Sequence, residues 1–128
     1  TYYNPNAYSW LDVNSEDIIT KVSVKEFNGS NPLDKHAIIG TMFFRNKDIY
    51  TGPLSQLYQK NHRTNGEFYI DNLLNEAIDM GYIVRNFEVD KYICWGTPTD
   101  LQTYKYWQNF FDTVDWHPYE YAKDYLTN

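Results

Sequence analysis

The chain has 128 residues, of which 42% are hydrophobic, 19% aromatic and 22% charged, and its formal net charge at pH 7 is −6. This length suits one domain with one hydrophobic core, and the negative charge argues against a surface that binds nucleic acid. No membrane-spanning apolar run or basic leader is visible, and the single cysteine excludes an internal disulfide, so we expect a cytoplasmic protein without a membrane partner.

Two β-rich runs open the chain. Residues 8–13 alternate between two faces, and residues 18–24 return after a polar turn at 14–17, which predicts a β-hairpin. The segment 26–34 is rich in Asn, Gly and Pro and predicts a loop. The mostly apolar run 36–44 then has the pattern of a strand buried on both faces.

Helical patterns follow. The short run 53–60 and the longer run 67–80 carry apolar residues at helical spacing, and Gly81 stands where a C-cap glycine is expected. Residues 83–89 alternate as a strand. Thr97 has the pattern of an N-cap that begins a further helix.

The fold class follows from this order of elements. Pro98 and Asp100 occupy the first and third positions of the helix after Thr97, and residues 119–126 suit a final aromatic helix. Strands and helices interleave, so the order of elements predicts a single domain over residues 1–128 of the α/β or α+β class, and we take α/β, with a mixed sheet and flanking helices. The aromatic residues between 107 and 125 would suit a subunit contact, and a homo-oligomer is one expectation.

The turn before the last long helix is one candidate site. Cys94-Trp95-Gly96-Thr97 leads from an apolar run into a capped helix, where free backbone N–H groups suit an anion. By spacing alone, a simple helix start is the better interpretation. The three histidines of the chain share no ligand-like spacing, so we assign no catalytic residue and no metal ligand.

Two charged residues are further candidates. Glu67 follows Asn65 and Gly66 at a predicted helix start, where its carboxylate could hold sugar hydroxyls or only complement the helix dipole. Lys25 closes the second β-run, where its ammonium could pair with a phosphate, although most such lysines are simply solvated.

The order of five motifs resembles that of a known enzyme family. The motifs are Asn-Pro-Asn-Ala-Tyr and the strand after it at 4–13, the β-run at 19–26, Ile-Gly-Thr-Met-Phe-Phe at 39–44, Asn-Gly-Glu-Phe-Tyr at 65–69, and the stretch 87–101 that contains Gly-Thr-Pro-Thr-Asp-Leu. Any one motif is modest, and the order carries the resemblance. The family is the sugar-phosphate nucleotidyltransferases, in the subgroup found among bacterial capsule and surface-polysaccharide enzymes.

The resemblance implies the C-terminal half of a Rossmann-like nucleotide-diphospho-sugar transferase fold. Its implied activity is a Mg²⁺-dependent transfer of a nucleoside monophosphate from a nucleoside triphosphate to a sugar 1-phosphate or similar acceptor, with release of pyrophosphate. Lys25 matches the family lysine that binds the acceptor phosphate, and Glu67 matches its ligand for sugar hydroxyls. The implied substrate-binding residues are Tyr8, Lys25, Gly40, Asn65, Gly66, Glu67, Trp95, Gly96 and Thr97.

The chain also departs from the family pattern. Val24 and Glu26 flank Lys25 where the family has Glu and Pro, Ser9 replaces a Gly, and Cys94 stands where many members have a magnesium-binding Asp. No Gly-rich nucleotide loop is present, which predicts the acceptor half of a protein of roughly twice this length. The alternative is a non-catalytic carbohydrate-binding or assembly module derived from the same fold. The nucleotide base and the acceptor are left open.

Overall fold

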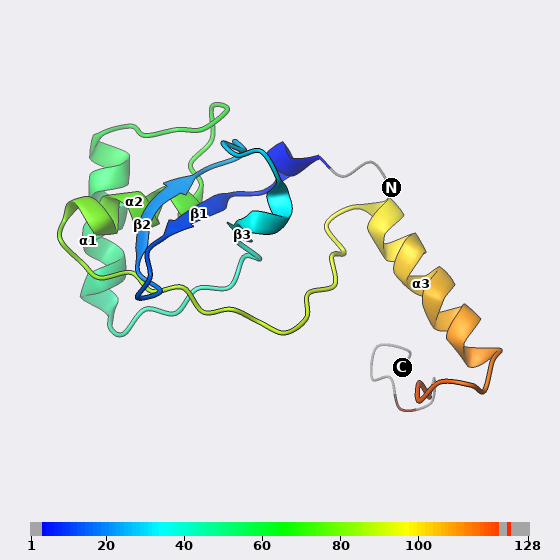
Figure 1. The fold of residues 1–128 in the computed structure, drawn as a ribbon. Helices are drawn as coiled ribbons and strands as arrows, with labels where there is room; N and C mark the ends of the chain where they lie inside the picture. Colours follow the sequence, from blue (N-terminus) through cyan, green and yellow to red (C-terminus); the bar gives the residue numbers. More distant parts are fainter. Residues whose placement is uncertain (1–3, 121–122, 124–128) are drawn as a thin grey trace. The chain divides into compact units, whose positions relative to one another are not determined.

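The structure, a computed structural model, describes residues 4–120 and 123. The sequence predicts one domain, and the chain divides into two compact units, the first ending at Glu88 and the second beginning at Val89. The first unit contains η1 (Pro5–Ala7), β1 (Trp10–Val13), β2 (Ile19–Ser23), η2 (Pro32–Asp34), β3 (His36–Ala37), α1 (Lys47–Gln59) and α2 (Ile70–Asp79), and the second contains α3 (Pro98–Asp112) (Figure 1). None of the helices in the described part of the chain is long and apolar enough to cross a membrane.

The predicted hairpin is confirmed. β1 and β2 pair antiparallel, with Leu11 opposite Val22. The register shifts in the middle of the pair, so that Thr20 is an extra residue in β2. Because such a bulge reverses the alternation of side chains, Ile19 and Val22 are both buried although they lie three residues apart.

The strand predicted at 36–44 is wrong beyond its first two residues. β3 pairs antiparallel with the start of β1, which makes a three-stranded sheet in the order β2–β1–β3. One further bond joins the Ile38 N–H to the Ser9 carbonyl, at 2.8 Å. The residues before Ser9 form the 3-10 helix η1 rather than extended strand, so in the described part of the chain β1 offers no partner for the residues after Ile38. The Phe43 side chain in that segment is 91% exposed.

Helix α1 begins six residues before its predicted start. The Asn46 side chain accepts hydrogen bonds from the N–H groups of Asp48 and Ile49, so the helix begins at Lys47 rather than at Pro53. Pro53 lies inside the helix, where its missing N–H removes a single hydrogen bond, and its ring is buried.

Helix α2 is shorter than predicted at its start and ends as expected. It begins at Ile70 instead of residue 67, because residues 64–67 form a tight turn. It ends on Gly81, whose φ of 83° suits a residue without a β-carbon. The Tyr82 N–H reaches back to the Ala77 carbonyl at 3.0 Å, which completes the predicted cap.

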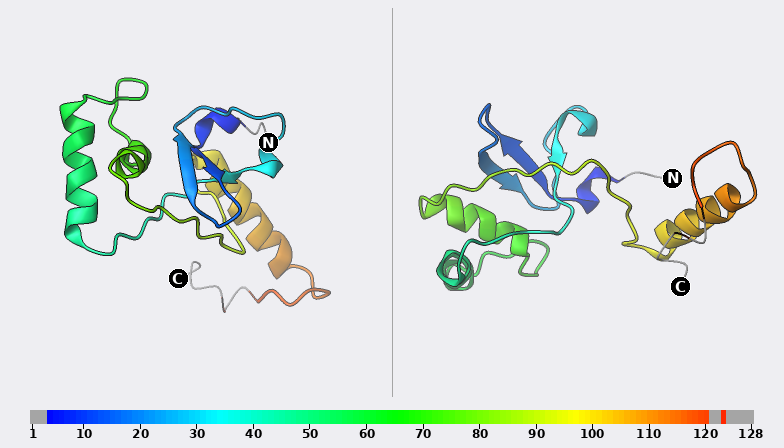
Figure 2. Two further views of the ribbon diagram at one scale, coloured as in Figure 1. Left: turned by 60° about the vertical axis from the view of Figure 1, so that its left-hand side comes forward. Right: turned by 90° about the horizontal axis from the view of Figure 1, so that it is seen from below.

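The first unit is layered. α2 contacts β2 on one side and α1 on the other, so that it lies between the sheet and α1 (Figures 1 and 2). The core between the sheet and α2 consists of buried aliphatic side chains: Leu11, Ile19, Val22 and Leu74. Each such side chain contributes about 1.5–3 kcal/mol by leaving water, so this contact holds α2 on the sheet.

The strand predicted at 83–89 is reduced to a single bridge, between Ile18 and Arg85. Around it, the Ile19 N–H donates to the Val84 carbonyl at 2.8 Å. Further along the same edge of β2, the Asn75 side chain exchanges two 2.9 Å hydrogen bonds with the backbone of Val22. A side chain therefore occupies the place that a longer strand would need.

The second unit is built on α3. Thr97 and Asp100 form the predicted capping box, which confirms the start of this helix. Near its end the Phe111 ring lies 4.6 Å from the His117 ring and 5.9 Å from the Trp107 ring, measured between centroids. Most of the helix predicted at 119–126 falls on residues 121, 122 and 124–126, which lie outside the described residues.

Candidate functional site

Lys25 lies near Tyr69, which is far from it in the sequence and only two residues after Glu67. The Lys25 ammonium lies 5.5 Å from the centroid of the Tyr69 ring, within the range of a cation–π contact. Glu67 is the main cause of a rise in the pKa of the Tyr69 hydroxyl. Asp71, in the first turn of α2, adds a second negative charge close to the same phenol. We call these four residues the Tyr69 cluster.

Lys25 has a strained backbone conformation and an ammonium group that is held by a hydrogen bond. Its φ of 55° lies in the left-handed region, which costs a residue with a β-carbon about 1 kcal/mol. The ammonium donates a 2.5 Å hydrogen bond to the carbonyl of Ala7, just before Tyr8. Since an ammonium has three N–H donors, this bond leaves donors for a ligand. Such strain is found most often where a side chain must be placed for function.

A tight turn presents Glu67. Backbone hydrogen bonds of 2.9 and 3.0 Å join Thr64 and Glu67, and the two residues between them, Asn65 and Gly66, have φ angles of 51° and 82°. Two consecutive positive φ angles define the turn that Asn-Gly favours. The Arg63 guanidinium also donates to the Gly66 carbonyl, at 2.8 Å. Asn65 and Gly66 thus shape the loop that carries Glu67, which lies outside the helix that we predicted for it.

The pKa of Tyr69 is raised above its usual value of 10.0. The hydrogen bond to Glu67 is the main cause, followed by partial burial and by the negative charges of Glu67 and Asp71. The phenol is therefore protonated at physiological pH. Asp71 in turn accepts a 2.5 Å hydrogen bond from the buried Ser9 hydroxyl, which ties the residue next to Tyr8 to α2.

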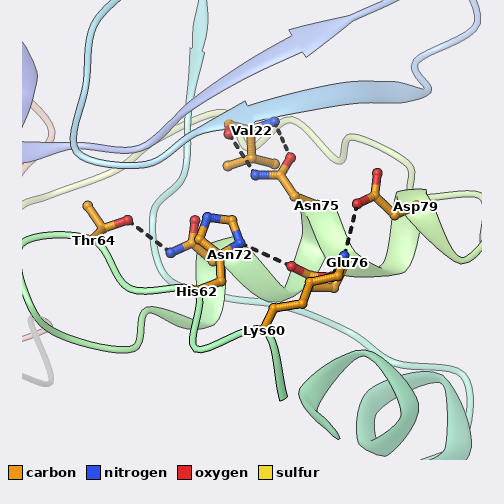
Figure 3. A network of polar contacts seen from close by, with 8 residues as sticks. All are labelled: Val22, Lys60, His62, Thr64, Asn72, Asn75, Glu76 and Asp79. Atoms are coloured by element: carbon orange, nitrogen blue, oxygen red, sulfur yellow. Dashed lines mark hydrogen bonds and ion pairs between the residues drawn. The ribbon is translucent and has the colours of Figure 1, made fainter. Parts of the chain in front are cut away.

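Buried polar side chains of α2 fix the segments around the cluster (Figure 3). The Asn72 amide, 2% exposed, donates to the Thr64 hydroxyl at 2.9 Å and so reaches the turn that carries Glu67. Asn75, one turn later, binds the backbone of Val22 in β2. Because buried polar groups are costly unless they are paired, these contacts specify where α2 lies on its neighbours.

Glu76 holds the end of α1 in the same way (Figure 3). Its carboxylate is 2% exposed and accepts from the Lys60 ammonium at 2.6 Å and from the His62 ring at 3.0 Å. Asn61, with a φ of 49°, turns the chain so that His62 can reach it. Burial alone raises the pKa of Glu76, but the two hydrogen bonds and the charge of Lys60 outweigh it and hold the pKa below 4.5. Glu76 raises the pKa of Lys60 above 10.5.

The remaining predicted site residues are placed differently. Gly40 lies in the irregular chain after β3, exposed and with a φ of 91°, and a β-carbon added to it would have no neighbour within 4 Å. In the second unit, the Gly96 N–H lies 3.4 Å from the Cys94 sulfur, and the Thr97 N–H binds Asp100 at 3.1 Å. These N–H groups serve the helix start, which is the simpler of the two interpretations of this turn.

Trp95 also belongs to the second unit. Its ring centroid lies 5.1 Å from that of Tyr104, one and a half turns into α3. The contact packs the residue before the cap against the helix. An aromatic partner of this kind stabilises the turn without any ligand.

Cys94, at the position where the resemblance would place a magnesium-binding Asp, does not suit that ion. The Cys94 thiol donates to the Asp100 carboxylate at 3.6 Å, and the same carboxylate oxygen accepts from the Thr97 hydroxyl at 2.8 Å. A thiol is a soft ligand, whereas Mg²⁺ prefers oxygen. Within residues 4–120 and 123, no group of three His, Cys, Asp or Glu side chains is arranged to hold a metal ion.

Sequence reasoning singled out Lys25 and Glu67 but missed the residues between and behind them. Tyr69, Asn72 and Glu76 were assigned only to a helix. One signal was available: polar residues at 72, 75 and 76 alternate with leucines and an alanine in a helix whose apolar stripe is broad. Polar side chains beside such a stripe are candidates for buried hydrogen bonds.

Comparison of the chain with protein families, with curated proteins and with solved structures found no match.

Proposed function

We propose that this chain is the acceptor-binding half of a sugar-phosphate nucleotidyltransferase with a Rossmann-like fold. One observation carries the proposal: the Lys25 ammonium, expected to bind the acceptor phosphate, lies 5.5 Å from the Tyr69 ring centroid, two residues after Glu67, the expected ligand of its hydroxyls, and Glu67 raises the pKa of Tyr69. A cation and a carboxylate at one tyrosine suit a ligand with a phosphate at one end and hydroxyl groups at the other.

The proposed reaction needs positioning more than covalent help. A phosphate oxygen of the sugar 1-phosphate attacks the α-phosphorus of the nucleoside triphosphate, a new P–O bond forms, and the bond to the β-phosphate breaks with release of pyrophosphate. Lys25 would neutralise and orient the attacking phosphate, and Glu67 would accept hydrogen bonds from the sugar. Mg²⁺ supplies charge neutralisation in such reactions, and we assign none of its ligands to this chain.

The first test separates the two ends of the acceptor. We expect Glu67→Gln to weaken binding of a hexose 1-phosphate by about tenfold, because it replaces a charge-assisted hydrogen bond by a neutral one. Binding of inorganic phosphate should stay unchanged, since Glu67 has no part in holding the phosphate. Both affinities are measured by NMR titration of the chain.

Glu16→Gln is the matched control, because Glu16 is an exposed carboxylate in the hairpin turn at the other end of β2. It should change neither affinity. Equal weakening of both ligands by Glu67→Gln, or none of either, would contradict the role of Glu67.

A second expectation concerns turnover. The chain by itself should release no pyrophosphate from a nucleoside triphosphate and a hexose 1-phosphate, because its sequence contains no Gly-rich loop to hold a triphosphate. The measurement is a coupled pyrophosphate assay over several triphosphates. Pyrophosphate release above the protein-free rate would show that the nucleotide site lies within these residues.

A second candidate function is a non-catalytic carbohydrate-binding or assembly module. It is favoured by exposed aromatic rings in the second unit, where Trp107 is 48% and Trp116 is 72% exposed. Rings of this kind bind the faces of unphosphorylated sugars. In that case tryptophan fluorescence would respond to neutral oligosaccharides as strongly as to sugar phosphates, whereas the nucleotidyltransferase proposal requires the phosphate.

A further inference from the structure

The turn that carries Glu67 is joined to the interior of the protein at Thr64. The Thr64 hydroxyl accepts a 2.9 Å hydrogen bond from the side chain of Asn72, which is 2% exposed in the first turn of α2. Asn72 is thus held in the interior, and Thr64 is the residue of the turn that binds it (Figure 3).

A displacement of Thr64 is passed on to Glu67. The two backbones are joined by hydrogen bonds in both directions, of 2.9 and 3.0 Å. Asn65 and Gly66, between them, are already held at positive φ angles of 51° and 82°, so the turn moves as a unit. The position of the Glu67 carboxylate is therefore set from Asn72 through Thr64.

The other contacts of this loop do not tie the turn to the interior, and the Arg63 bond to the Gly66 carbonyl comes from an exposed side chain. Lys60 and His62 bind Glu76 and fix the end of α1, before the turn begins. The Arg63 guanidinium lies 3.9 Å from the Phe68 ring centroid and covers the outside of the loop. Of these contacts, only the Thr64–Asn72 bond joins the turn itself to a buried side chain.

We propose that Thr64 and Asn72 are positioning residues for Glu67, and that their hydrogen bond sets how the site contacts the hydroxyl groups of a sugar phosphate. The ligand in this statement rests on the proposed function. The effect of Glu67 on the pKa of Tyr69 does not, and it can be tested without a ligand.

The test uses the Tyr69 hydroxyl as a reporter of Glu67. Thr64→Val removes the acceptor for Asn72 and keeps the shape of the side chain. We expect the pKa of Tyr69, raised by Glu67 in the native chain, to fall back toward 10.0 in this variant. The measurement is a pH titration of the Tyr69 Cζ signal by ¹³C NMR.

Two variants serve as controls. Thr64→Ser restores the hydroxyl and should titrate like the native chain. Thr20→Val removes the hydroxyl that donates to the Asp12 carbonyl at 3.0 Å, in the same unit but in the middle of the hairpin, and should leave Tyr69 unchanged. An equal change in Thr20→Val would show a general loosening and would overturn the proposal.

Asn72→Ala covers the case in which Thr64→Val does not fold, because it leaves no buried amide without a partner. It should lower the pKa of Tyr69 in the same direction. If Tyr69 titrates as in the native chain in every folded variant that lacks the Thr64–Asn72 bond, the positioning role is overturned.

Ligand binding then tests the second part. Thr64→Val should reduce the affinity for a hexose 1-phosphate by about three- to tenfold and leave the affinity for inorganic phosphate unchanged. Equal weakening of both ligands would overturn the role in hydroxyl recognition. A native chain that binds no hexose 1-phosphate would overturn the proposed function, while the Tyr69 titration would still decide whether Thr64 and Asn72 position Glu67.

Discussion

Lys25→Met is expected to reduce the affinity for a sugar 1-phosphate by roughly 10- to 100-fold, the size of a lost charge-assisted hydrogen bond in a partly buried place. The Lys25 ammonium is already held by the Ala7 carbonyl and the Tyr69 ring. A bound phosphate can therefore interact with this positive charge without the entropic cost of ordering a mobile side chain. Inorganic phosphate should lose affinity to a similar extent. Isothermal titration calorimetry at low salt measures both ligands.

The substitution isolates the ammonium from the backbone. Methionine also has a β-carbon, so the cost of the left-handed φ of 55° stays the same. Lys21→Met removes the same charge from an exposed position in β2 and should leave both affinities within about a factor of two. If Lys21→Met and Lys25→Met weaken phosphate equally, the effect is one of net charge and Lys25 has no special role.

Glu76→Gln is expected to lower the free energy of unfolding by about 1–3 kcal/mol. The carboxylate is buried and bound by Lys60 and His62, and a neutral amide cannot accept from both in the same way. This expected loss is smaller than for a fully buried ion pair, because the Lys60 side chain is 48% exposed and water screens its charge. Urea denaturation followed by circular dichroism gives the difference.

Asp79→Asn is the matched control for this prediction. Asp79 lies 3.4 Å from the same Lys60 ammonium, but its side chain is 67% exposed. A surface pair of this kind contributes less than about 1 kcal/mol, so the variant should unfold nearly as the native chain does. A loss as large as that of Glu76→Gln would show that the burial of Glu76 is not what matters.

The dependence of stability on pH follows from the same group. Because folding lowers the pKa of Glu76 below 4.5, its contribution is fully present above that pH and is lost as the pH falls through the lowered value. The raised pKa of Lys60 acts at the other end: its contribution is present below 10.5 and is lost as the pH rises through the folded value. Glu76→Gln should therefore flatten the acid limb of the stability profile below pH 4.5.

Local sequence predicted three of the turns and caps of this protein. The hairpin at 10–23, the end of α2 on Gly81 and the start of α3 on Thr97 agree with the sequence patterns. Each of these features depends on residues within a few positions of one another. Such interactions are already complete in the local chain, so a pattern of neighbouring residues is enough to predict them.

Strand lengths were decided by the tertiary structure. Residues 36–44 and 83–89 both carry strand patterns, yet the first pairs over β3 alone and the second over one bridge. A strand forms only where another backbone pairs with its N–H and C=O groups. The residues before β1 form η1 instead of extending the strand that pairs with β3, and the Asn75 side chain occupies the edge of β2 that residues 83–89 would need. The propensity of the segment itself contains no information about that partner.

The candidate site shows the same division. Lys25 and Glu67 could be selected from the sequence as a phosphate ligand and a hydroxyl ligand, through charge, local pattern and resemblance. That the Lys25 ammonium lies near the Tyr69 ring, two residues after Glu67, follows only from the packing of α2 against the sheet, and the bond from Asn72 to Thr64 is likewise visible only in the structure. Sequence determines which charges and turns are available, whereas long-range hydrophobic burial decides which of them come together, because it brings distant segments into contact without regard to their order in the chain.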